Sequence, residues 1–313
     1  MGGRSCEHGD GMIAHAGTIP PAFSPVRLLT GWSLSPLPLV LTLAAGILYA
    51  LGLRRLSRPG ARGPRFPTGR VVAFFGGLAA TLVAVASPVD TYAGVSFSDH
   101  MVQHILLMFV AAPLFALGTP VTLALRAARP QTRKRWILPV LHSRAMSMLT
   151  NPLVAVALFT VVQYVTHLTS FYDLALRSDP IHELEHALYL VTAILFWWPV
   201  VGLDPAPHRM SHPARLLYLV AAMPLEAFLA VALLSASPYP HYLALPPPWG
   251  GAAAMADQDT AAAFMWIVGD LSALVAVLLV AASWFRHDEV KQRRIEAELD
   301  RVAATPGTTP RAG

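Results

Sequence analysis

The 313-residue sequence has few charged residues and a single cysteine. Asp, Glu, Lys and Arg make up only 13% of it, against about 25% in an ordinary soluble domain, and 55% of the residues are hydrophobic. Such a chain has too little polar surface to fold in water and needs lipid around it. Because Cys6 is alone, an intramolecular disulfide and a zinc or iron–sulfur site built from several thiolates are both excluded. Any metal ion must be held by His, Met or carboxylate side chains.

Two further patterns are missing. Residues 1–30 carry Glu7 and Asp10 and contain no continuous apolar core, so they do not read as a cleaved signal peptide, and the first hydrophobic helix is expected to direct insertion. The net charge is +5, but the basic residues are dispersed along the chain. A nucleic-acid partner would require them to lie together on one surface, so none is expected.

Long apolar runs fill most of the remaining sequence. A helix needs about 20 mostly apolar residues to cross the hydrocarbon core of a bilayer. Seven such runs predict an all-α membrane protein, a bundle of seven transmembrane helices in contact with lipid. The runs lie near residues 32–53, 71–88, 101–119, 152–170, 183–202, 214–235 and 261–284.

The distribution of Lys and Arg predicts the orientation of this bundle. With seven spans, 20 of the 23 basic residues fall on one side, and only Arg4, Arg27 and Arg177 fall on the other. Positively charged loops are retained in the cytoplasm. We therefore expect a multi-pass plasma-membrane protein with its N-terminus outside and its C-terminus in the cytoplasm.

Three regions follow from this topology. Residues 1–31 form an extracytoplasmic tail, residues 32–285 the seven-helix membrane domain, and residues 286–313 a cytoplasmic tail. Acids and bases alternate at helical spacing in the first part of the cytoplasmic tail, which predicts an exposed helix, and its end from Ala304 is expected to be disordered. The proline-rich segment 235–260 is predicted to be a long outer loop that covers a cluster of outer-side histidines or presents a surface to a partner protein.

The histidines gather on the predicted outer side. His100 and His104 open the third helix, His182 and His186 open the fifth, and His167 lies near the outer end of the fourth. The spacing of each pair puts both imidazoles on one face of a helix. Strongly polar side chains in membrane segments usually face the bundle interior and carry function. The sequence therefore predicts a metal site made by these five histidines.

Two methionines on the third helix add soft ligands to this prediction. Met101 follows the first histidine, and Met108 lies one turn below His104. Imidazole suits copper, zinc and iron, whereas a thioether favours copper(I). The alternative is that the histidines are polar groups at the membrane surface, hydrogen-bonded to neighbours such as Glu183 and Glu185, and that the methionines only fill space.

The residues HELEH at 182–186 also match the H-E-x-x-H pattern of zinc hydrolases, in which two histidines bind zinc and the glutamate is the general base. Such a site needs a third protein ligand. Asp204 is excluded because eighteen residues of helix place it about 27 Å from His186. Asp257, Asp259 or Asp270 remain possible ligands.

Other polar residues have no settled role. Glu226 and Asp270 lie inside apolar runs, where they would pair with a cation, relay a proton or remain protonated. The segment HRMSH at 208–212, on the predicted cytoplasmic side, carries His208 and His212 and is a weaker candidate for a second metal site.

Three blocks together resemble one known family. They are HMVQHILLMFVAAPLFALGTPVTLALR at 100–126, HELEH at 182–186 and DQDTAAAFMWIVGDL at 257–271. They are similar to the CtaG-type cytochrome c oxidase assembly proteins of Gram-positive bacteria, and the similarity spans roughly residues 30–285. The resemblance implies a non-enzymatic assembly factor that binds copper and passes it to a haem–copper oxidase subunit.

Carried over by position, the family's histidine pairs fall on those of the third and fifth helices, and its last motif falls on Asp257, Gln258, Met265 and Trp266. Three other functions stay open from the residues alone. The protein would be a b-type cytochrome with haem held between histidines, an outer-leaflet metallohydrolase, or a metal-free assembly scaffold.

Overall fold

The computed structural model describes residues 19–20, 31–32, 35–58 and 64–304, so most of the predicted outer tail and the end of the predicted cytoplasmic tail lie outside the described residues. All regular structure in the described part is helical. The helices are α2 (Pro36–Leu56), α3 (Thr68–Ala86), α4 (Pro88–Ala93), α5 (Phe97–Ile105), α6 (Ala112–Gly118), α7 (Pro120–Ala127), α8 (Pro130–Thr132), α9 (Leu138–Leu141), α10 (Arg144–Leu149), α11 (Pro152–Leu168), α12 (Phe171–Leu176), α13 (Asp179–Val201), α14 (His212–Ser235), α15 (Pro240–Leu243) and α16 (Ala252–Ala304), with π-helical turns η1 (Leu106–Ala111) and η2 (Arg133–Ile137).

Six helical segments are long and apolar enough to cross a membrane. They are 36–56, 68–93, 97–127, 179–201, 212–243 and 252–301. A shorter apolar helix, α11, has 17 residues and is therefore about 25 Å long, slightly less than the hydrocarbon core. The prediction of a helical membrane protein is confirmed, whereas the seventh span and the orientation stay predictions.

Helix α16 is longer than the sequence pattern suggested. It is a single helix of 53 residues that includes both the last predicted span and the exposed charged segment after it. The predicted loop 235–260 is correct up to residue 251, apart from the short helix α15, and wrong from Ala252, where α16 begins. Alanine is the best helix former, and Ala261 and Ala262 are fully buried in the cluster that joins α16 to α5 and α14. Tertiary packing thus extends this helix into the expected loop.

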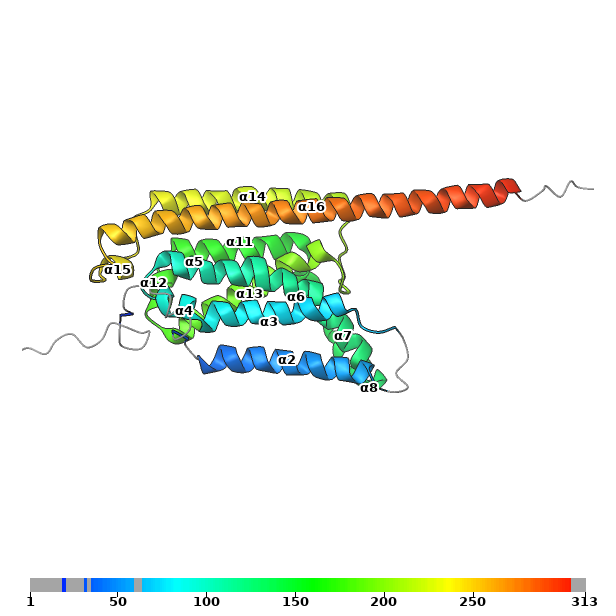
Figure 1. The fold of residues 1–313 in the computed structure, drawn as a ribbon, viewed down its shortest axis with the longest axis horizontal. Coiled ribbons are helices and arrows are strands. Elements are labelled where there is room, and N and C mark those ends of the chain that lie inside the picture. Colours follow the sequence, from blue (N-terminus) through cyan, green and yellow to red (C-terminus); the bar gives the residue numbers. More distant parts are fainter. Residues whose placement is uncertain (1–18, 21–30, 33–34, 59–63, 305–313) are drawn as a thin grey trace, which may run out of the picture.

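The long helices lie side by side, with the α14 and α16 pair at one edge of the bundle and α2 at the other (Figure 1). The short helices α4, α12 and α15 cover one end, which we call the α4 end, and α7 and α8 lie at the other, the α7 end (Figure 1). Helix α2 is mostly exposed on the bundle's edge, and Tyr49 is its main anchor. The Tyr49 ring stacks on Phe74 at 3.8 Å, and its hydroxyl donates to the carbonyl of Gly118 at 2.8 Å.

One candidate span is divided into several helical pieces, and the chain changes direction between the last two, at the α7 end. Segment 97–127 runs through α5, η1, α6 and α7. Thr119 has a φ of 49°, and the following Pro120 starts α7. Close packing requires glycine just before this break, since a Cβ on Gly118 would lie 2.7 Å from the Cβ of Phe74. The break lets the chain turn while α6 stays packed against α3.

Candidate metal centre

Two helices carry most of the predicted ligands, and the fold brings them together near the α4 end. The short helix α5 begins at Phe97 after Ser96, whose hydroxyl accepts from the backbone N–H of Asp99 and so caps the helix. It bears His100 and His104 on its buried face. Helix α13 begins at Asp179 and bears His182 and His186 in its first turns. All four imidazoles are buried, so the spacing prediction that each pair shares one inward face is confirmed.

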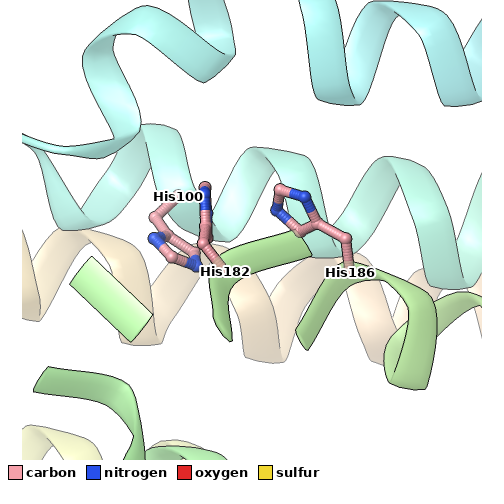
Figure 2. A group of neighbouring side chains, drawn as sticks. All are labelled: His100, His182 and His186. Atoms are coloured by element: carbon pink, nitrogen blue, oxygen red, sulfur yellow. The ribbon is translucent and has the colours of Figure 1, made fainter. Parts of the chain in front are cut away.

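Three of these histidines form one group of converging ligand atoms. One ring nitrogen each of His100, His182 and His186 lies within 4.8 Å of the others. The ring centroids of His100 and His182 are 5.0 Å apart, and those of His182 and His186 are 4.2 Å apart. Figure 2 shows His100 from α5 pointing toward the two side chains of α13. Because zinc and copper bind imidazole nitrogen at about 2.0 Å, small rotations suffice for three nitrogens to meet one ion.

A second group shares His100 and adds an acid. His100, His104 and Glu185 also place one ligand atom each within 4.8 Å of one another. The Nε2 atoms of the two histidines are 3.0 Å apart, and a carboxylate oxygen of Glu185 lies 3.4 Å from Nε2 of His100. All three side chains are fully buried. A buried carboxylate among imidazoles is the arrangement that a bound cation would stabilise.

Glu185 is the candidate ligand that the sequence prediction misses. The prediction makes it a hydrogen-bonding neighbour of the histidines, with no more weight than Glu183. A helix turns about 100° per residue, which puts Glu185 about 60° from His182 and about 100° from His186. Glu183 lies at the same two angles on the other side of the pair, where it is half-buried and lines a cavity. Helical spacing therefore does not separate the two glutamates, and only the position of His100 beside Glu185 does.

His167, on α11, lies beside this second group. Its ring centroid is 5.6 Å from that of His104. Its Nδ1 atom lies 2.9 Å from the carbonyl of Gln163 and 2.9 Å from the hydroxyl of Tyr189, while Nε2 is buried and has no hydrogen bond to any described residue. A proton on Nδ1 would be donated to the Gln163 carbonyl, which leaves Nε2 with a lone pair for a metal ion.

The two methionines lie in apolar surroundings. Met101 is fully buried in the cluster that joins α5, α14 and α16, and Met108 is buried in a second cluster with α13 and α14. Met108 is part of the π-helical turn η1, and its carbonyl accepts from the indole N–H of Trp197 at 2.8 Å. Both environments fit packing side chains, and their role as ligands stays a prediction.

Aromatic rings enclose the inner side of the cluster. The imidazole of His104 stacks on Tyr189 with centroids 4.0 Å apart, and Tyr172 lies 4.8 Å from the ring of His100. Both tyrosines are fully buried. Because such a wall excludes water, electrostatic interactions within the cluster are stronger than they would be at a surface.

A cavity of about 450 Å³ opens on the other side of the cluster. His182, Glu183 and His186 line it together with His241, and so do two further acids, Asp90 of α4 and Asp179 at the start of α13. His104 and Glu185 do not line it. Two side chains of the first group, His182 and His186, are therefore accessible from this cavity, whereas the second group lies deeper.

The last family motif anchors the helix that carries the ligands. Asp257 on α16 accepts hydrogen bonds from the backbone N–H groups of Phe97 and Ser98, at the start of α5. Gln258 donates to the carbonyls of Leu233 and Ala236 at the end of α14, both at 3.0 Å. These contacts tie α5, α14 and α16 together, so Asp257 supports the site without belonging to either ligand group.

The histidines at the α7 end do not form a comparable group. Nε2 of His208 lies 3.1 Å from the hydroxyl of Ser147, and His212 packs against His287 with ring centroids 5.5 Å apart. Among the residues that the structure describes, no third His, Cys, Asp or Glu joins them in a ligand group.

Fold and site together define a helical membrane protein with a buried histidine and glutamate cluster close to one end of its bundle. The chain belongs to the family of cytochrome c oxidase caa3 assembly factors (Caa3_CtaG), which it matches over residues 47–287. The resemblance noted from the sequence is thereby confirmed.

Relatives in mycobacteria share most of the chain. It is 33% identical over 293 residues to uncharacterised proteins of Mycobacterium bovis and Mycobacterium tuberculosis, with 91% of this chain and 43% of each relative covered. An uncharacterised protein of Mycobacterium leprae is 32% identical over 288 residues, which cover 89% of this chain and 42% of the relative. The chain thus spans less than half the length of these relatives. No solved structure matches it.

Proposed function

We propose that this assembly factor binds copper at the buried cluster and delivers it to a subunit of the haem–copper oxidase in the plasma membrane. The observation that carries the proposal is the convergence of His100, His104, His182, Glu185 and His186, which come from two helices and are buried near the α4 end of the bundle. Imidazole and carboxylate ligands suit copper(II), and a change to copper(I) would favour the histidines alone. Family membership supports the oxidase as the destination.

The overlap of the two ligand groups supports transfer. His100 belongs to both groups, while His182 and His186 line the cavity and Glu185 lies deeper. One ion needs about four ligands, and more than four are present. An ion could therefore pass between a cavity-side position and a deeper position while His100 stays bound. The mechanism would be ligand exchange, with no bond of a substrate broken.

Elemental analysis of the protein purified in detergent tests copper binding. We expect about one copper per chain in the parent, almost none when His100, His104, His182 and His186 are all replaced by Ala, and an unchanged amount in His142→Ala. His142 is a suitable control because it is exposed and distant in the fold, in a loop after α9. A copper-free parent after copper loading would instead favour the scaffold.

Delivery is tested in cells. Replacement of His104 or His186 by Ala is expected to lower the copper content and activity of the oxidase while the variant stays in the membrane. Normal oxidase activity in both variants would refute delivery through this cluster, whatever the purified protein binds.

The orientation can be tested with the single native cysteine. If the N-terminus is outside, a membrane-impermeant maleimide added to intact cells should label Cys6, and Cys6→Ser should abolish the label. Labelling only after the cells are opened would place the N-terminus inside and reverse the predicted topology.

A metallohydrolase is the second candidate, because the structure adds a third ligand to the HELEH pattern. His100 joins His182 and His186, and Glu183 lines the adjacent cavity, where a substrate would bind. A zinc-bound water activated by Glu183 would then be the nucleophile. Glu183→Gln would abolish hydrolysis of a substrate and keep the metal, whereas oxidase assembly that survives this change would support ligand exchange.

A b-type haem fits the cluster less well. Axial haem ligation requires imidazoles on opposite faces of a flat macrocycle. Here the Nε2 atoms of His100 and His104 are 3.0 Å apart, and the rings of His182 and His186 also lie next to each other. The absence of a haem absorption band after haem-replete expression would exclude this alternative.

A further inference from the structure

Two carboxyl groups line one small cavity in the apolar part of the bundle, outside the metal centre. Glu226 comes from α14 and Asp270 from α16, the two helices that form one edge of the bundle (Figure 1). The helices approach closely here because residue 269 is glycine. A Cβ at Gly269 would lie 3.0 Å from Cγ of Glu226 and 3.2 Å from its Oε1 atom. The Glu226 side chain thus lies directly on the backbone that carries Asp270.

The two carboxyl groups are incompletely hydrogen-bonded within the described part of the chain. Oδ2 of Asp270 accepts from the indole N–H of Trp266 at 2.9 Å. Oδ1 of Asp270 and Oε1 of Glu226 are buried and have no protein partner among the residues described. An oxygen left this way in hydrocarbon is strongly unfavourable. Water or a proton is therefore expected at these atoms.

Small cavities next to Glu226 leave room for water. One offers about 20 Å³ to the centre of a water molecule and is lined by Glu226, Gly269 and Asp270 with apolar side chains. A smaller one, of about 10 Å³, is lined by Gln163 and Tyr164 of α11 and by Glu226. A single buried water needs about 10 to 15 Å³ and two or more polar partners. The larger cavity meets both conditions and lies between the two acids.

The surroundings offer no cation to balance two negative charges. The residues that line the two cavities come from η1, α11, α13, α14 and α16, and none of these lining residues is Lys, Arg or His. The only other titratable group is the hydroxyl of Tyr164, which donates to the carbonyl of Leu225 at 2.7 Å. Because two unbalanced charges are strongly disfavoured in such a place, a proton held at Glu226 is the remaining way to lower the charge of the pair.

We propose that Glu226 and Asp270 form an intramembrane proton-binding site that exchanges its proton through water in the adjacent cavity. The site is separate from the proposed copper centre in its residues and in its chemistry. Gln163 lies between the two, because its side chain lines the cavity of Glu226 and its carbonyl contacts His167.

Modification by dicyclohexylcarbodiimide tests this site, because this apolar reagent adds to protonated carboxylic acids inside membranes. The full chain in lipid nanodiscs should be modified at Glu226 or Asp270, as located by peptide mass spectrometry. The modification should decrease several-fold as the pH rises from about 5 to about 9, since the carboxylate does not react.

Asp204 is the matched control. It is a buried carboxyl too, but it lies outside the candidate spans and accepts from the N–H groups of Val121 and Thr122 and the hydroxyl of Thr122. It should remain unmodified. Glu226→Gln should remove the label at position 226, and Gly269→Ala should reduce it by displacing the carboxyl group. If both acids of the parent chain stay unmodified across the pH range, while unfolded protein reacts at both, the proposal is wrong.

An infrared difference spectrum gives a second readout that does not depend on reagent access. The parent should show the carbonyl stretch of a protonated carboxylic acid, shifted by deuteration as expected for an exchangeable proton. Glu226→Gln together with Asp270→Asn should remove that band. A parent without the band would also overturn the proposal, and neither outcome depends on whether copper binds.

Discussion

Two aspartates have the same structural task at opposite ends of the bundle, but only one of them supports a site. Asp257 accepts from backbone N–H groups at the start of α5, at the α4 end. Asp204 does the same for α7, at the α7 end, where it accepts from the N–H groups of Val121 and Thr122 at 3.1 and 2.7 Å. In both cases a carboxylate from a distant segment satisfies helix N–H groups that have no partner within the helix.

The ends differ in what the anchored helix carries. Helix α5 holds two histidines that face three polar side chains of α13, all of them buried. Helix α7 carries no such ligands, and its surroundings are basic and largely exposed. The same anchoring contact thus contributes only stability at one end and also ligand geometry at the other.

The largest effect is expected from Glu185→Gln, which keeps the shape of the side chain and removes its charge. Copper affinity should fall about 100-fold or more, because the carboxylate lies beside two ligating histidines and balances the charge of the ion. Titration of the purified variant with a competing chelator measures this. Glu183→Gln is the control on the same helix, and equal losses in the two variants would contradict the distinction between them.

Asp257→Asn is expected to lower the copper affinity less than Glu185→Gln does, and also to lower the stability of the fold. The loss of a charged acceptor at the start of α5 should lower the free energy of unfolding by about 1.5–3 kcal/mol. Copper affinity should fall about 10-fold, since the helix that carries His100 and His104 becomes less well fixed. Asp259→Asn, an exposed neighbour on α16, is the control. Unchanged affinity in Asp257→Asn would show that α5 is held by its packing alone.

Asp204→Asn sharpens the contrast between the two ends. It should lower the free energy of unfolding by about 1.5–3 kcal/mol, as Asp257→Asn does, because a charged acceptor at the start of α7 is lost. Copper affinity should not change. Thermal unfolding in one detergent, together with the same chelator titration, tests both statements. A loss of affinity as large as that of Asp257→Asn would mean that the two ends are coupled.

The smallest effect is expected from His212→Ala combined with His287→Ala. These imidazoles pack against each other near the α7 end without a third ligand among the described residues. The copper content of the purified protein should stay within experimental error of the parent. A decrease of one copper per chain would instead reveal a second site and restore the weaker sequence prediction for segment 208–212.

Two pairs of histidines with the same spacing show where sequence reasoning succeeds. The pairs 100/104 and 182/186 lie within helices, and the predicted shared face is found in both. His208 and His212 have the same spacing, but His212 begins α14 while His208 precedes the helix and contacts Ser147. This spacing puts two side chains on one face only where the backbone is helical. The boundary of a helix depends on local caps and packing.

The HELEH segment illustrates a second limit. The pattern drew attention to Glu183, because it occupies the position of a general base. The structure places Glu185 beside His100, which lies on a helix more than 80 residues earlier in the chain. Helical geometry places the two glutamates symmetrically about the histidine pair, so it can neither favour Glu185 nor identify its neighbour. The predicted loop 235–260 is too long for a related reason. The first turns of α16 lie within that segment, and they are stabilised by packing against α5 and α14.

By itself the sequence determined that this chain is a bundle of apolar helices in a membrane, and which faces of two helices carry histidines. Hydrophobic runs and residue spacing are local properties that decide this. Only the tertiary structure decided that the histidines of α5 and α13 come together, that Glu185 joins them and that Glu226 and Asp270 line one cavity. Apolar faces are nearly interchangeable partners, so which of them come into contact depends on the packing of the whole bundle.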